Sequence, residues 1–135
     1  MNTKLLMTAS AIIMGANGII ASFMPREILQ TLGQTPTSTL ILIVQIAGAL
    51  YFGFALMNWM AKSFLIGGIY AKPLSAGNLA HFGIAGIALI KVVINSSVTS
   101  TYILVLAIVY VLFAIAFGIV FVTNPKVKQV TIERK

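Results

Sequence analysis

Long stretches of this chain contain no charged residue, and this limits what it can fold into more than any other feature. Asp, Glu, Lys and Arg are absent from residues 5–24, 39–61, 73–90 and 99–125. A helix of about 20 apolar residues crosses the hydrocarbon core of a bilayer, which is about 30 Å thick. Each stretch is long enough for this, so the sequence predicts an all-α membrane protein.

Composition agrees with a chain that lies almost wholly in the membrane. Of its 135 residues, 59% are hydrophobic and only 8% are charged, whereas soluble domains carry about 25% charged residues. We predict a single transmembrane domain with four spans, at about 5–24, 39–61, 74–94 and 102–123. Short connections make successive spans antiparallel neighbours, so the expected arrangement is an up-down-up-down four-helix bundle. A short charged tail, 126–135, follows.

Two of the segments that connect the spans contain residues that predict their local structure. Segment 25–33 begins with Pro25 and ends with Gly33, which is typical of a short helix, and its apolar residues favour a position at the membrane interface. Thr37 or Ser38 is expected to cap the second span. Segment 62–73 is apolar but contains Gly67, Gly68 and Pro73, and it is predicted to be an interfacial or partly re-entrant hairpin.

Basic residues predict the orientation of the spans. With four spans, seven Lys and Arg residues fall on one side of the membrane and two on the other. The first side carries Lys4, Lys62, Lys72, Lys126, Lys128, Arg134 and Lys135, and the second carries Arg26 and Lys91. Because basic residues concentrate on the cytoplasmic side, both termini are predicted to be cytoplasmic.

Missing residue types exclude several kinds of chemistry. The chain has no cysteine, and its two acidic residues, Glu27 and Glu133, lie outside the predicted spans. Thiolate sites, paired-carboxylate catalysis and carboxylate-rich metal sites are therefore not expected, and we predict no metal or cofactor. Transport coupled to protons or cations normally uses a carboxylate within the membrane, which these spans lack. The net charge of +7 fits basic residues that flank the spans and face anionic lipid headgroups. No nucleic-acid partner is therefore predicted.

Polar residues inside the spans are the first candidates for function. Asn78 and His81 are three residues apart and share a face of the third span. His81 is either a ligand, for example to haem across a homodimer, or a histidine hydrogen-bonded to a neighbouring helix. Lys91 is either an anion-attracting residue or a side chain that extends to the interface. Asn17 and Gln45 are candidates for pore lining or for hydrogen bonds between helices.

Small and aromatic residues suggest packing and anchoring. Small residues recur every three or four positions in the first span, and Ala49 with Gly53 repeats this spacing in the second, which favours close helix contacts. Aromatic residues are expected to anchor the spans near their ends. These are Tyr51, Trp59, Tyr70, Tyr102 and Tyr110.

The segments 57–59, 66–70 and 77–82, together with Pro73, resemble those of small bacterial four-span membrane proteins of uncharacterised function. The layout is also similar to that of the DoxX-like group. The resemblance implies a bacterial inner-membrane location but no activity. It directs attention to one connection, and the ligand-binding candidates there are Asn58, Tyr70, Asn78 and His81.

Three functions remain open from the sequence. The first is a non-enzymatic accessory or structural membrane protein that binds lipid, further copies of itself or another membrane protein. The second is a homo-oligomeric channel or transporter for an anion or small neutral solute, which predicts that Asn17, Gln45 and Asn78 line a common path. The third is a haem- or quinone-binding redox module that uses His81.

Overall fold

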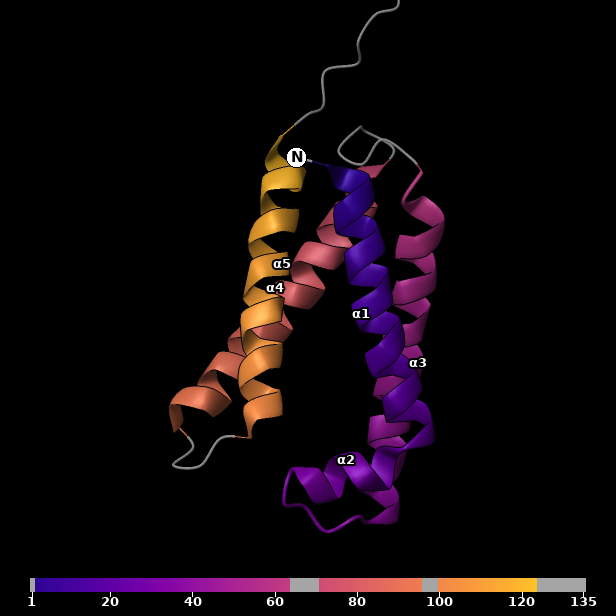
Figure 1. Cartoon of the computed structure of the whole chain (residues 1–135), viewed down its shortest axis with the longest axis vertical. Helices are drawn as coiled ribbons and strands as arrows, with labels where there is room; N and C mark the ends of the chain where they lie inside the picture. Colours follow the sequence, from indigo (N-terminus) through magenta and orange to yellow (C-terminus); the bar gives the residue numbers. More distant parts are fainter. Residues whose placement is uncertain (1, 64–70, 96–99, 124–135) are drawn as a thin grey trace, which may run out of the picture.

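The computed structural model of the protein describes residues 2–63, 71–95 and 100–123, and within these ranges every regular element is a helix. Figure 1 shows their arrangement. The helices are α1 (Thr3–Phe23), α2 (Pro25–Thr31), α3 (Ser38–Ala61), α4 (Lys72–Asn95) and α5 (Thr101–Val122). The predicted interfacial or re-entrant form of 62–73, the candidate Tyr70 and the tail 126–135 lie wholly or mostly outside the described residues.

Four of these helices are long and apolar enough to cross a membrane, namely α1, α3, α4 and α5. For the described residues, the prediction of an all-helical chain with four such helices is confirmed, and the observed ends lie within two residues of the predicted ones. Pro73 lies within the first turn of α4 rather than before it. A proline is tolerated there because the first N–H groups of a helix have no partner within it.

The short helix α2 and its flanks follow the local signals. Pro25 is its first residue. Gly33 has a φ of 70°, a conformation that favours glycine, and it turns the chain two residues after the helix ends. Thr37 then caps α3, since its hydroxyl accepts a hydrogen bond of 3.3 Å from the backbone N–H of Leu40.

Helices α1 and α3 pack with their backbones in direct contact. A Cβ atom added to Gly18 would lie 2.7 Å from the backbone nitrogen of Phe52, and one added to Gly48 would lie 2.7 Å from that of Ser22. Residues late in α1 thus meet residues early in α3, so the two helices run antiparallel. The prediction that Ala49 and Gly53 face a neighbouring helix is wrong. Ala49 is exposed, and a Cβ added to Gly53 would meet nothing within 4 Å. Gly48 instead provides the small surface that faces α1.

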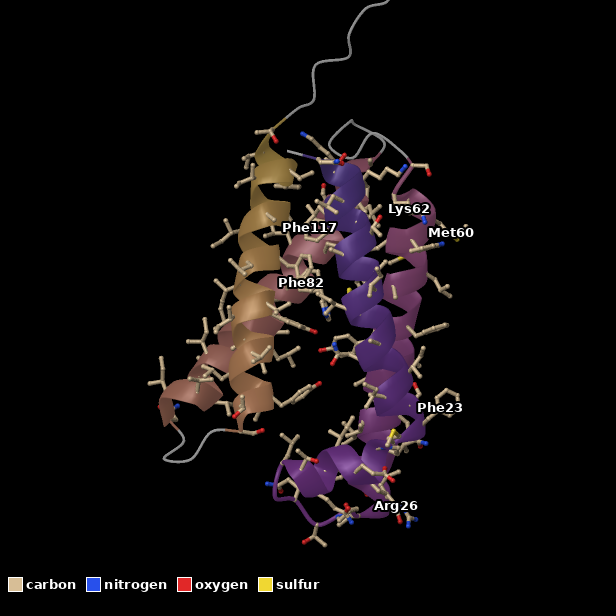
Figure 2. All side chains as sticks on the ribbon, viewed as in Figure 1. Phe23, Arg26, Met60, Lys62, Phe82 and Phe117 are labelled. Atoms are coloured by element: carbon tan, nitrogen blue, oxygen red, sulfur yellow. The ribbon has the colours of Figure 1, made fainter. Side chains whose placement is uncertain are left out.

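Helices α4 and α5 form a second pair whose contact is largely aromatic. The ring of Phe82 stacks on those of Phe113 and Phe117, with centroid distances of 4.8 and 5.7 Å. Figure 2 shows Phe82 and Phe117 together where α4 crosses α5. Further along, Gly86 lies opposite Tyr110, where an added Cβ would sit 3.6 Å from the tyrosine Cβ.

The two pairs are joined mainly by side chains. No Cα atom of α4 comes within 8 Å of a Cα atom of α1 or α3 among the described residues. Figure 1 shows the α4–α5 pair leaning away from the α1–α3 pair toward the end where α2 lies. The groups that bridge this separation are therefore decisive for how the halves fit together.

Candidate functional site

The central bridge is a pair of asparagines, one from each helix pair. Asn58 of α3 and Asn78 of α4 are both fully buried. Each amide donates to the other: Asn58 Nδ2 to Asn78 Oδ1 at 2.7 Å, and Asn78 Nδ2 to Asn58 Oδ1 at 2.8 Å. The two carboxamides meet across a separation that is too wide for backbone packing.

The remaining hydrogen-bonding capacity of this pair is also used. Asn58 Nδ2 donates to the hydroxyl of buried Ser10 on α1 at 3.0 Å, and Asn78 Nδ2 donates to the carbonyl of Leu74 at 2.9 Å. Each carboxamide has two N–H donors, so every donor of the pair has a partner. Ser10 in turn donates to the carbonyl of Met7 at 3.0 Å. The network joins α1, α3 and α4 and leaves no amide hydrogen for a ligand.

His81 lies one turn further along α4, inside an aromatic cage. Its ring stacks on Phe54 at 5.2 Å and meets the edge of Tyr51 at 5.1 Å. Its Nε2 atom is 3.4 Å from the hydroxyl of Tyr110 on α5. Across the described residues, no group of three His, Cys, Asp or Glu side chains is placed to hold a metal ion. His81 therefore contacts residues of both helix pairs, through ring contacts with Tyr51 and Phe54 of α3 and a hydrogen bond with Tyr110 of α5.

The other predicted polar residues lie apart from one another. Asn17 accepts a hydrogen bond of 2.6 Å from the hydroxyl of Tyr102, which ties α1 to α5. Gln45 is exposed and donates to the carbonyl of Ser22 at 3.3 Å. Lys91 is exposed near the end of α4. Asn17, Gln45 and Asn78 thus have separate partners.

Sequence reasoning missed some members of the interior polar set. Ser10 gave no signal, because isolated serines are common in membrane helices. Tyr51 and Tyr110 are not anchors at helix ends: both lie in the middle of their helices, and Tyr110 is only 1% exposed. Trp59, by contrast, lies in the last turn of α3 and stacks under the ammonium group of Lys62 at 2.9 Å. An aromatic and a basic residue together are typical of a membrane interface.

A crevice opens between the helix pairs toward the α2 end. Its inner chamber measures about 190 Å³ and is lined by Asn17 and by the three tyrosines 51, 102 and 110, with aliphatic residues between them. A second chamber of about 180 Å³ lies against α2 and shares Ile28 and Tyr102 with the first. A mouth of about 570 Å³ follows at Thr31 and Leu32, beside the start of α5.

Comparison of the chain with protein-family models, with curated proteins and with solved structures gives no match. The resemblance to DoxX-like and other small four-span proteins therefore stays a prediction. Function has to be argued from the side-chain geometry.

Proposed function

We propose that this protein is a non-enzymatic accessory or structural protein of the membrane that binds lipid or a partner membrane protein. The observation that carries the proposal is the network of Asn58, Asn78 and Ser10. Their polar side chains hydrogen-bond to one another across three helices. The described residues hold no buried side-chain nitrogen or oxygen without a hydrogen-bond partner. Such an interior favours stable assembly over chemistry, because catalysis and ion transfer need polar groups that are free to interact.

The proposed topology is an up-down-up-down crossing of a bacterial inner membrane, with both termini in the cytoplasm. Antiparallel contacts within each helix pair support it, and so does the Asn58–Asn78 bridge between the pairs. Figure 2 places Lys62 at one end of the molecule and Arg26 at the other. With four crossings, seven of the nine Lys and Arg residues of the sequence belong to the Lys62 side, and this makes it the cytoplasmic side under the positive-inside rule.

Single-cysteine labelling tests this topology directly, because the natural chain contains no cysteine. Ser63→Cys and Gln34→Cys replace exposed residues beyond opposite ends of α3. In intact cells, a membrane-impermeant maleimide should label Gln34→Cys and should reach Ser63→Cys only after the membrane is opened. Labelling of both from outside, or the reverse pattern, would refute the proposed orientation.

Native mass spectrometry of the full chain, released from mild detergent, tests the accessory role. We expect the protein alone, as a defined oligomer, or with a co-purified membrane protein, and in each case with lipid as the only small molecule. A retained haem or other chromophore would contradict the proposal, and visible absorption lost in His81→Ala would identify the redox alternative. Conductance by the purified protein in planar bilayers would contradict it in favour of a channel.

A further inference from the structure

The crevice between the helix pairs has features that packing alone does not require. Its inner chamber has mostly apolar walls that contain a few hydroxyl and amide groups. It opens between α3 and α5, because Tyr102 and Ile43 are each about half exposed, at 46% and 55%. In a protein that spans a bilayer, an opening of this kind faces lipid rather than water. This side opening therefore admits an occupant from the membrane, whereas the mouth at Gln34 lies at the end of the helices.

The polar groups of the inner chamber select the chemistry of that occupant. The Tyr102 hydroxyl donates to Asn17 Oδ1, and Asn17 Nδ2 donates to the carbonyl of Ile13 at 2.8 Å. The phenol oxygen can still accept a hydrogen bond, and the carboxamide has a second N–H donor. None of the described residues that line the inner chamber is charged. A charged headgroup would lose its hydration there without a compensating charge, whereas hydroxyl and carbonyl oxygens would find partners.

The one charged residue at the outer part of the crevice also disfavours an anionic occupant. Among the described residues that line its three parts, Glu27 is the only charged one, and it borders the chamber against α2. A carboxylate at this position repels an anionic phosphate. Ile20, Met24 and Leu32 make the rest of that chamber apolar, which suits hydrocarbon chains.

We infer that the crevice is a binding site for an uncharged glycerolipid, a diacylglycerol, whose hydroxyl and ester oxygens lie among Tyr51, Tyr102 and Asn17. The acyl chains run past Ile28 along α2 and out between the helix pairs into the bilayer. This site deepens the proposed function and rests on it only in requiring that the four long helices span a membrane.

Photocrosslinking of the full chain in vesicles of phosphatidylethanolamine and phosphatidylglycerol tests the site. The probe is a trace of diacylglycerol with a photoreactive group near its glycerol end. Crosslinks should map to peptides that contain Tyr51 or Tyr102, and excess unlabelled diacylglycerol should remove them. A phosphatidic acid probe with the same chains should label these peptides about tenfold less, because its charge is disfavoured in the chamber.

Two matched variants locate the site. Ala47 lines the inner chamber, and Ala47→Phe should fill it and lower the labelling severalfold. Ala49 lies on the same helix but is exposed outside the crevice, so Ala49→Phe should label like the natural chain. The helical circular dichroism and elution volume of each variant establish that it is folded, and competition on the natural chain needs no variant.

Three results would overturn the site: labelling that excess diacylglycerol does not reduce, equal labelling by phosphatidic acid, or displacement by a long-chain alcohol but not by diacylglycerol. The cysteine-labelling test at Ser63 and Gln34, repeated in the same vesicles, separates the two proposals. Correct topology with failed crosslinking refutes the crevice site alone, whereas wrong topology refutes the membrane arrangement on which both depend.

Discussion

The asparagine bridge makes a quantitative prediction about stability. Replacing Asn58 with leucine keeps a similar volume but removes the two hydrogen bonds to Asn78 and the one to Ser10. Hydrogen bonds between membrane helices contribute on average about 0.6 kcal/mol each, so the three together contribute about 2 kcal/mol. The Asn78 carboxamide would also stay buried with an unpaired oxygen and one unpaired N–H, at a cost of about 1–3 kcal/mol. We expect Asn58→Leu to lower the free energy of unfolding by about 3–5 kcal/mol.

The double variant separates this account from a simple loss of contacts. In Asn58→Leu/Asn78→Leu neither partner is left unpaired, and two apolar side chains of similar shape meet across the helix pairs. Replacing both partners of a buried hydrogen bond in this way is often nearly neutral. The double variant should therefore be more stable than Asn58→Leu alone, and the two substitutions should be strongly non-additive.

Unfolding in mixed micelles, followed by circular dichroism over a titration with dodecyl sulfate, measures these free energies. Gln45→Leu is the control, because its single interhelical hydrogen bond lies on an exposed surface and its loss should cost about 0.6 kcal/mol or less. Additive effects of Asn58→Leu and Asn78→Leu, or an Asn58→Leu effect no larger than that of the control, would refute the reasoning.

Three further outcomes follow from the packing and the caps, each measured by the same titration. Gly48→Ala should destabilise the α1–α3 contact by about 1–3 kcal/mol, because its methyl group meets backbone atoms. Gly53→Ala is the control and should have no such effect, because the space around Gly53 is open. Equal effects of the two substitutions would contradict the close contact at Gly48. Tyr102→Phe removes the hydroxyl that donates to Asn17 and should cost about 0.5–1.5 kcal/mol; no change would mean that this link adds nothing. Thr37→Ala removes the cap of α3 and should cost about 0.5–2 kcal/mol, with Thr37→Ser restoring most of it; a failure of serine to restore stability would argue against capping.

Features that depend on a few neighbouring residues were predictable. Pro25 and Gly33 bound a short helix, and Thr37 caps the next one, because these effects act within one helical turn. Asn58, Asn78 and His81 were identified as candidates around one connection because polar residues are rare in apolar helices. The hydrogen bonds between Asn58 and Asn78 were not predictable, since these residues lie in different helices and their meeting depends on how each helix is rotated.

The positions of the tyrosines were also not predictable from the sequence. Tyr51 and Tyr110 were predicted to anchor the spans at the membrane interface, yet the structure places them around His81 in the interior. In a soluble helix, a polar face would have shown which side points outward. A membrane helix is apolar on the side that faces lipid as well as on the side that faces protein. Periodicity therefore cannot assign its inner face.

By itself, the sequence determined the helical class, the four membrane-crossing segments and the absence of cysteine and of acidic residues within them. It did so because the cost of placing a charge in a bilayer is a property of each segment of about 20 residues. Only the tertiary structure decided that Gly48, and not Gly53, faces α1, that Asn58 and Asn78 join the two helix pairs, and that a tyrosine-lined crevice remains between them. These depend on helix rotation, which is set by the fit of side chains from distant parts of the chain.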